Sequence, residues 1–176
     1  MENSNGAATE VSKPLWLRMV AGRNPKLTLV RLIVLVVTSF VLFKVVLAPI
    51  RVTGISMQPT YQDGQINFVN RFAYFSRSPA RGDVVGIKAS DQLQVLYLKR
   101  VIGLPGETVA IRKGTVFVDG KAVDELYLKN QKPWRIEPTK LQMDEYVVIG
   151  DNRTMDQENH TFGKIRRSDI VGRILW

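Results

Sequence analysis

A serine and a lysine in this chain stand in local sequences that suit them to act together in catalysis. Ser56 lies in the segment GISMQPT (residues 54–60), and Lys99 follows it by 43 positions in the segment YLKRVIGLPGE (residues 97–107). Burial in an apolar strand disfavours the ammonium form of a lysine, so its neutral amine can accept the proton of a nearby serine. The pair therefore predicts cleavage of peptide bonds without a histidine triad.

Composition limits the sites and partners that the chain can have. The 176 residues suit one domain with a terminal extension, and the formal net charge of +9 suggests contact with an anionic partner. Basic residues in the second part of the chain are scattered among acidic ones, which argues against nucleic acid and leaves membrane lipid. With no cysteine and one histidine, His160, we expect no thiolate or multi-histidine metal centre.

An apolar stretch near the N-terminus predicts a membrane anchor. Residues 27–47 contain a charge-free run over 32–43, and as a helix they would extend about 31 Å, roughly one bilayer core. Pro49 is then expected to end the helix. A buried core helix would show a wider polar face, and a cleavable secretory signal would end at a small-residue site, which Pro49-Ile50-Arg51 does not provide.

The charges around this stretch predict its orientation. Five basic residues precede the charge-free run over 32–43 and two closely follow it, so the positive-inside rule keeps the N-terminus in the cytoplasm. We expect a cytoplasmic tail with an interfacial segment over 1–26, a transmembrane signal-anchor helix over 27–48 and an extracytoplasmic domain over 49–176. Within the tail, residues 1–13 are polar enough for disorder, and Pro14–Gly22 is expected to lie at the membrane interface.

Beyond the anchor, the pattern is that of short strands. β-branched apolar runs bounded by turn residues predict strands at 84–88, 95–99, 109–112, 115–118, 121–123, 146–149 and 170–176. Lys113-Gly114 and Asp119-Gly120 are typical of tight hairpin turns. Residues 126–142, with two prolines, are expected to form an excursion loop. The fold class predicted is mostly β, with coiled antiparallel or barrel-like sheets after one transmembrane helix.

Five segments together resemble the type I signal peptidases, membrane-anchored serine–lysine proteases that remove signal peptides from exported preproteins. In order, these segments are the anchor, SMQPT (56–60), RGDVV (81–85), KRVIGLPGE (99–107) and GDNR (150–153). The resemblance implies signal-peptide-bearing substrates with small residues before the cleavage, no metal or organic cofactor, and a bacterial plasma membrane with the catalytic domain outside. It leaves open a mitochondrial or thylakoid membrane instead, and whether a partner peptidase subunit is needed.

The resemblance also implies a role for each residue around the two main motifs. Ser56 would be the nucleophile that forms an acyl-enzyme, and Lys99 would be the general base, with its pKa lowered toward neutrality by burial. The Ser56 N–H and one further donor would hold the oxyanion. Some relatives supply that donor from a hydroxyl two positions earlier, where this chain has Gly54. Met57 and Pro59 would shape the substrate cleft.

A third motif begins at GDNR (150–153) and runs to residue 160. It keeps its first part and then departs from the family pattern. Asp151, Asn152 and Arg153 are retained as supporting residues, but Asp156, Glu158, Asn159 and His160 replace a serine, an aspartate, a serine and an arginine. In the family, the first serine orients the lysine amine, and the aspartate and arginine brace the site. Glu158 and His160 remain candidates for such a bracing pair.

Asp156 is the replacement with the largest chemical consequence. A carboxylate beside Lys99 would favour the ammonium and oppose the neutral amine that the mechanism needs. Asp156 is therefore turned away, protonated, or the sign of a specialised or weakly active member. This departure supports a second candidate function, a membrane-bound paralogue that binds signal peptides or assists a partner without cleaving them.

Two further enzyme classes share parts of this pattern. The self-cleaving SOS repressors use related serine and lysine motifs on a similar β scaffold, but they are soluble, and the apolar anchor argues against them. A hydrolase pairing Ser56 with His160 would need a group that orients the histidine, and only Glu158 is nearby in sequence.

An aromatic run over 72–75, flanked by arginines, suits either insertion into the outer leaflet or ordinary core packing.

Overall fold

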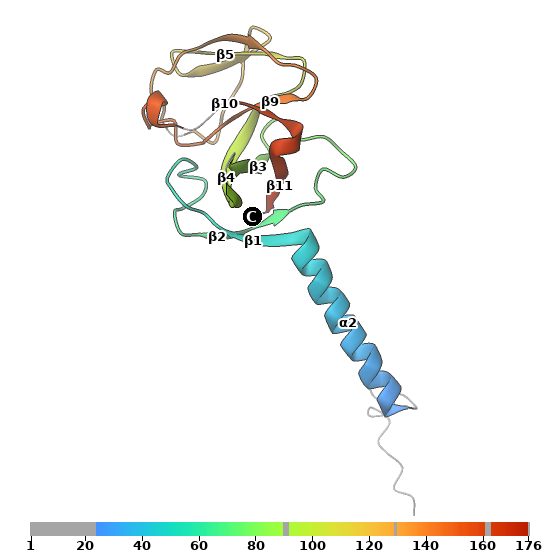
Figure 1. The fold of residues 1–176 in the computed structure, drawn as a ribbon. Coiled ribbons are helices and arrows are strands. Elements are labelled where there is room, and N and C mark those ends of the chain that lie inside the picture. Colours follow the sequence, from blue (N-terminus) through green and yellow to red (C-terminus); the bar gives the residue numbers. More distant parts are fainter. Residues whose placement is uncertain (1–23, 90–91, 129, 161–162, 176) are drawn as a thin grey trace, which may run out of the picture. The chain divides into compact units, whose positions relative to one another are not determined.

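The computed structural model describes residues 24–89, 92–128, 130–160 and 163–175 (Figure 1). The expected tail over 1–13 and the expected interfacial segment over Pro14–Gly22 lie outside these residues. The chain divides into two compact units, Met1–Leu42 and Phe43–Trp176. The candidate catalytic residues all belong to the second unit.

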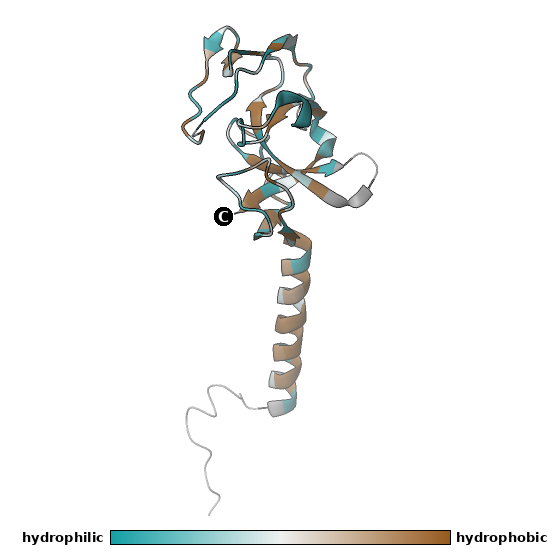
Figure 2. Ribbon diagram, turned by 90° about the vertical axis from the view of Figure 1, so that its left-hand side faces the viewer, coloured by the Kyte–Doolittle hydropathy of each residue, from teal (hydrophilic) through white to brown (hydrophobic). Residues whose placement is uncertain are grey.

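One long helix, α2 (Pro25–Val46), is apolar over most of its length, and Figure 2 shows its hydrophobic colouring interrupted at only a few positions. Its residues from Lys26 to Val46 are long and apolar enough to cross a membrane. The helix ends two residues before the predicted position 48, because Ala48 precedes a proline and is therefore disfavoured in helical conformation. Leu47–Arg51 instead form strand β1, and Pro49 is accommodated there because β1 is an edge strand.

A seven-stranded antiparallel sheet forms most of the second unit. Its strand order is β1-β2-β11-β3-β4-β9-β10, with β1 at one edge. The strands after β1 are β2 (Ile66–Asn70), β3 (Val84–Ala89), β4 (Gln92–Gly103), β9 (Glu145–Ile149), β10 (Gly163–Arg166) and β11 (Ile170–Leu175). Register shifts in the β3–β4, β4–β9 and β3–β11 pairs bend this sheet. The prediction of a mostly β fold with coiled antiparallel sheets is confirmed.

A four-stranded sheet lies at the end of the unit away from β1 and β2 (Figure 1). Its order is β7-β6-β5-β8, with β5 (Thr108–Arg112), β6 (Thr115–Val118), β7 (Lys121–Ala122) and β8 (Ile136–Lys140). Both predicted hairpin turns are confirmed. Lys113 and Gly114 have φ of 50° and 87°, and Asp119 and Gly120 have φ of 47° and 79°, as turns with two positive φ values require.

The prediction of an excursion loop over residues 126–142 is wrong in part. Residues Ile136–Lys140 form β8, which pairs with β5 from Thr108↔Lys140 to Ile111↔Ile136. β8 is an edge strand, where Pro138 removes no donor that the sheet needs. Strands β1, β2 and β10 were not predicted either, because exposed or polar residues interrupt their apolar pattern.

Three buried clusters hold these strands together. One joins the two sheets and includes Ile102, Val109 and Ile149. A second contains Met57, Tyr61 and Leu98 among its members, and a third includes Val85, Val101 and Val148. The second cluster places the segment around Ser56 against β4, the strand that carries Lys99. The aromatic run is split between core and surface, since Tyr74 is buried whereas Phe72 and Phe75 are exposed.

Candidate active site

The candidate nucleophile lies in a tight turn, residues 54–60, which we call the nucleophile turn. Ser56 is half-buried there, between the exposed Ile55 and the buried Met57. Gly54 has φ of +96°, a conformation that other residues rarely adopt, and its N–H donates to Asp63 Oδ1 at 2.8 Å. Among the described residues, none accepts a hydrogen bond from the Ser56 N–H. Gly54 thus shapes the turn, while the Ser56 amide stays available to a ligand.

Met57 and Pro59 have different surroundings. The Met57 side chain is 1% exposed and packs in the same cluster as Leu98, the neighbour of Lys99. Pro59 is exposed, and its carbonyl oxygen accepts a hydrogen bond from Gln62 Nε2 at 3.3 Å. Met57 therefore fixes the turn on β4 from within the core, whereas Pro59 borders the solvent.

Lys99 is a buried lysine in the middle of a strand. It pairs in register with Val85 of β3 and is only 3% exposed. Desolvation by burial lowers the pKa of its ammonium to about 8, although the Asp151 carboxylate acts in the opposite direction. Among the described residues, none forms an ion pair with Lys99. A substantial neutral fraction near physiological pH is the property that a general base requires.

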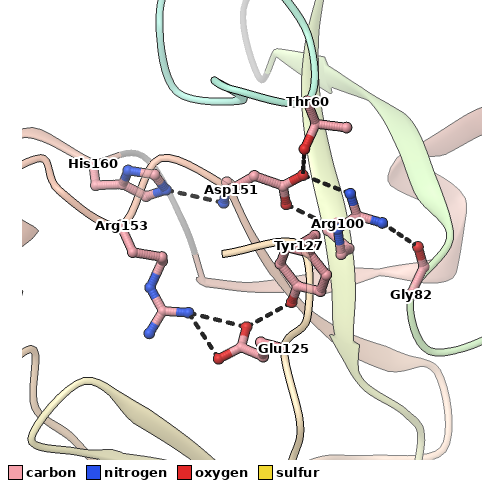
Figure 3. A network of polar contacts seen from close by, with 9 residues as sticks. Thr60, Gly82, Arg100, Glu125, Tyr127, Asp151, Arg153 and His160 are labelled. Carbon is pink, nitrogen blue, oxygen red and sulfur yellow. Dashed lines mark hydrogen bonds and ion pairs between the residues drawn. The ribbon is translucent and has the colours of Figure 1, made fainter. Parts of the chain in front are cut away.

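Arg100, the next residue along β4, connects this strand to the nucleophile turn through Asp151 (Figure 3). Its guanidinium donates to Asp151 from Nε at 2.8 Å and from Nη2 at 2.5 Å, and the pair is almost fully buried. Thr60 Oγ1 donates to the same carboxylate at 2.5 Å. Asp151 therefore holds the last residue of the turn and the neighbour of Lys99 in one fixed arrangement.

Asn152 ties the nucleophile turn to the segment after β9 by two further bonds. Its backbone N–H donates to the Ser56 carbonyl oxygen at 2.9 Å, and its side-chain Nδ2 donates to the Ile55 carbonyl oxygen at 3.0 Å. Both bonds engage backbone atoms beside the Ser56 hydroxyl. Residues 150–152 thus form a template on which the turn is held.

Arg153 is buried in a second ionic network, shown in the lower part of Figure 3. It pairs with Glu125 at 3.1 Å, and its Nη2 donates to the Gly114 carbonyl oxygen at 2.8 Å. Tyr127 donates to the same Glu125 carboxylate at 2.5 Å, and its ring lies 4.1 Å from the Arg100 guanidinium. Desolvation and the neighbouring Glu125 carboxylate raise the pKa of Tyr127, which keeps its hydroxyl protonated. This network links the second sheet to the Arg100–Asp151 pair.

The structure does not bring Asp156 to Lys99. Its carboxylate pairs with Lys132 Nζ at 2.5 Å, and its side chain is 64% exposed. This arrangement corresponds to the first of the three alternatives for Asp156, a carboxylate turned away from Lys99. Glu158 is also exposed, and among the described residues it forms no ion pair with His160. The expected Glu158–His160 bracing pair is therefore not present.

His160 is instead buried on the inner side of the same segment. Its Nε2 accepts a hydrogen bond from the Gly150 N–H at 2.9 Å, and its ring meets Trp134 edge to face at 4.7 Å. Desolvation, with smaller contributions from Lys99 and Arg153, lowers the pKa of His160 to about 3.

Sequence reasoning missed several residues that build this site. Thr60, Arg100, Glu125, Tyr127 and Trp134 were not among the predicted site residues. For Arg100 a signal was present, because an arginine inside an apolar strand needs a buried acid, and Asp151 lies in a matched motif. Glu125 and Tyr127 have no such signal, since the strand pattern ends just before them.

Comparison with known proteins gives a consistent set of matches. A family model described as "Signal peptidase, peptidase S26" matches residues 26–176. The chain is 35% identical to the probable signal peptidase I-2 of Synechocystis sp., over 67% of this chain and 56% of that protein. It is 32% identical to signal peptidase I of Leptolyngbya laminosa, over 68% and 63%. The chain thus spans less than two thirds of these two relatives.

Two other matches cover a larger share of the matched protein. The chain is 35% identical to signal peptidase I P of Bacillus subtilis subsp. natto, over 84% of this chain and 83% of that protein. A crystal structure of a signal peptidase I from Enterococcus faecalis is similar with a TM-score of 0.46 and 28% identity, covering 56% of this chain and 98% of that one.

Proposed function

Because the chain belongs to the signal peptidase family, peptidase S26, we propose that it is a membrane-bound serine endopeptidase that removes signal peptides from exported preproteins. Ser56 is the nucleophile and Lys99 the general base. The observation that carries this proposal is the buried Lys99, whose pKa is lowered to about 8 on the strand that packs against the nucleophile turn.

The proposed reaction begins when the neutral Lys99 amine takes the Ser56 proton. The Ser56 oxygen attacks the carbonyl carbon before the scissile bond, and a tetrahedral oxyanion forms. When that intermediate collapses, the peptide C–N bond breaks, the lysine proton goes to the leaving amine, and the signal peptide remains as an ester on Ser56. Water, deprotonated by Lys99, then attacks the ester and releases the signal peptide and the enzyme.

The Ser56 N–H supports the oxyanion part of this proposal. A backbone amide beside the nucleophile that has no acceptor within the described part of the chain is a suitable donor for the developing negative charge. The Gly54 amide is a weak candidate for the second donor, since Asp63 Oδ1 already accepts from it. The Asn152 bonds to residues 55 and 56 hold the amide of the turn in a fixed direction.

A groove beside β1 supports binding of the substrate as an extended strand. It has a volume of about 710 Å³ and is lined by Ala48, Pro49, Ile50, Arg51, Arg71, Lys88, Leu96 and Val171. In the described sheet, β1 pairs only with β2, so its other edge is open to a peptide backbone. Its lining includes Leu96 of β4, three residues before Lys99, whereas Ser56 and Lys99 do not themselves line it.

We propose that α2 anchors the chain once in a bacterial plasma membrane, with residues 49–176 outside. The apolar surface of α2 and the basic residues before it support this topology. The absence of cysteine from the sequence makes a direct test possible. Lys121→Cys, at an exposed site, should react with a membrane-impermeant maleimide on intact cells, whereas Ser4→Cys should react only after lysis. The opposite pattern would reverse the topology.

A cleavage assay on the full-length protein in detergent micelles tests the activity itself. The substrate is a preprotein with alanine at the first and third positions before the cleavage site. Ser56→Ala and Lys99→Ala should each reduce the rate by at least about 10³-fold. Ser168→Ala and Lys121→Ala change exposed residues of the same types and should leave the rate unchanged.

The possible outcomes separate the candidate functions. Substantial cleavage by Lys99→Ala would remove the lysine-base mechanism. A folded wild-type protein that binds signal peptide but does not cleave it would favour the non-cleaving paralogue. Against that paralogue stands the pairing of Asp156 with Lys132, because a carboxylate beside Lys99 was the main reason for suspecting weak activity.

A further inference from the structure

His160 is a buried imidazole that neither the catalytic dyad nor the ionic networks require. It is 4% exposed and lies at the left of the network in Figure 3, beside the start of the segment that carries Asp151. Its single nearby carboxylate in sequence, Glu158, points to solvent. A histidine at this depth needs a structural or mechanistic reason, since burial of a polar ring without purpose is costly.

The contacts of Gly150 supply that reason. The Gly150 N–H donates to His160 Nε2 at 2.9 Å. A Cβ built on Gly150 would collide both with the Ser56 carbonyl oxygen and with the His160 ring, the latter at 2.7–2.8 Å. Gly150 is thus packed closely against the Ser56 backbone and the imidazole, with no room for a side chain.

The bonds made by the two residues after Gly150 extend this coupling to the nucleophile turn and to Arg100, the neighbour of Lys99. Asp151 holds Thr60 and Arg100, and Asn152 holds the carbonyl groups of residues 55 and 56. The His160–Gly150 bond therefore fixes the start of a three-residue template to which the turn is attached.

The charges that face the ring require it to be neutral. Lys99 of β4 and Arg153 of the same segment both act on His160 as cations. The two buried carboxylates of the neighbouring networks have partners of their own, because Asp151 pairs with Arg100 and Glu125 pairs with Arg153. A neutral imidazole that accepts at Nε2 must carry its proton on Nδ1. Protonation of Nε2 would break the bond to Gly150 and add a third positive charge.

We infer that His160 is a positioning residue for the proposed peptidase reaction: its neutral imidazole accepts the Gly150 N–H and thereby holds the template that carries the nucleophile turn. This inference rests on the proposed function. It differs from the role that the family pattern implies at this position, where an arginine pairs with an aspartate.

The tautomer can be tested without any activity measurement. His160 is the only histidine, so a tag-free, ¹⁵N-labelled full-length protein in detergent micelles gives one imidazole spin system. Long-range ¹H–¹⁵N spectra should show a neutral ring with the proton on Nδ1 between pH 5 and pH 9. A ring that titrates near its ordinary pKa of about 6.5, or that carries its proton on Nε2, would overturn the inference.

Substitutions test the positioning role. His160→Gln keeps a neutral acceptor at the Nε2 position and should retain kcat within about threefold, whereas His160→Leu leaves the Gly150 N–H without an acceptor and should lower kcat at least about tenfold. His160→Arg places a cation beside Lys99, which lowers the lysine pKa and should move the acidic limb of the pH–rate profile to lower pH. Glu158→Gln, on the exposed side of the same segment, serves as the matched control.

The outcomes distinguish this inference from the proposed function. Equal kcat for His160→Gln and His160→Leu, with an unmoved pH–rate limb in His160→Arg, would refute the positioning role while leaving the peptidase intact. If His160→Leu does not fold, the kcat and pH–rate profiles of His160→Gln and His160→Arg still test the positioning role. Cleavage that survives Ser56→Ala would instead refute the proposed mechanism, whatever the histidine variants do.

Discussion

The third motif contains two neighbouring parts that lie in opposite environments. Its inner part, residues 150–153, is almost wholly buried, and the side chains of Asp151 and Arg153 are 0% and 1% exposed in their ion pairs. Its outer part, residues 156–159, includes the 3₁₀ turn η1 (Gln157–Asn159), which has no buried residue. The inner part keeps the family pattern without change, whereas three of the four replacements fall in the outer part.

The comparison shows where this site tolerates substitution. A residue whose charge is satisfied by a buried partner cannot change alone, because the partner would be left as an uncompensated buried charge. An exposed residue such as Asp156 loses only a solvent-screened pair when it changes. His160, the fourth replacement, lies beyond the outer part and is buried again, which is why it needed a new partner in Gly150.

The largest effect should come from breaking the Arg100–Asp151 pair. Asp151→Ala leaves the Arg100 guanidinium buried without its carboxylate and removes the acceptor of Thr60, so we expect a loss of about 3–5 kcal/mol in the free energy of unfolding. Asp156→Ala, the corresponding change in the outer part, should cost about 1 kcal/mol or less. Urea unfolding followed by tryptophan fluorescence measures both. Equal losses would abolish the distinction between the two parts.

The second effect concerns Arg153 and Glu125. Arg153→Met leaves the Glu125 carboxylate buried and should cost about 3 kcal/mol, while the double variant Glu125→Gln/Arg153→Met should recover part of that loss. Arg135→Met breaks an ion pair of the same kind with Glu137, but those two side chains are 80% and 73% exposed, so its cost should stay below about 1 kcal/mol. Strict additivity in the double variant would show that the buried pair is not coupled.

The pH dependence should reflect Lys99. Its ammonium has a lowered pKa of about 8, and only the neutral amine can accept the Ser56 proton. Activity should therefore rise with pH, with the acidic limb of kcat/KM centred near pH 8, and fall about tenfold for each unit well below it. A limb centred near pH 10 would mean that burial does not lower the lysine pKa, and it would contradict the arrangement around β4.

The smallest effects should come from the outer part. Asp156→Ser restores the residue of the family pattern, and Asp156→Asn removes only the charge. Because the Asp156 carboxylate pairs with Lys132 at the surface, both variants should cleave within about twofold of wild type and leave the acidic limb unmoved. Glu158→Ala should behave in the same way. A limb that moves to lower pH in both Asp156 variants would show that this carboxylate acts on Lys99 after all.

The sequence by itself determined features that depend on local chemistry. A long charge-free run can only be a helix that avoids water, and Lys113-Gly114 and Asp119-Gly120 meet the positive φ that their hairpins require, so α2 and the β5–β6–β7 region could be predicted. Burial of Lys99 followed from its apolar neighbours taken together with the family motif around it. Strand β8 could not be found in this way, since its alternation is masked by Pro138 and exposed residues.

Only the tertiary structure decided which polar and charged groups meet. Thr60 and Asp151 are 91 positions apart, and Arg153 and Glu125 are 28 apart. With 25 basic and 16 acidic residues in the chain, the sequence offers many possible pairs of similar energy. The choice among them depends on which strands lie side by side, and so does the fate of Asp156, which the sheets place beside Lys132 at the surface. Partner choice is a property of the assembled sheets, because Coulomb energies depend on distances and burial that no local sequence pattern specifies.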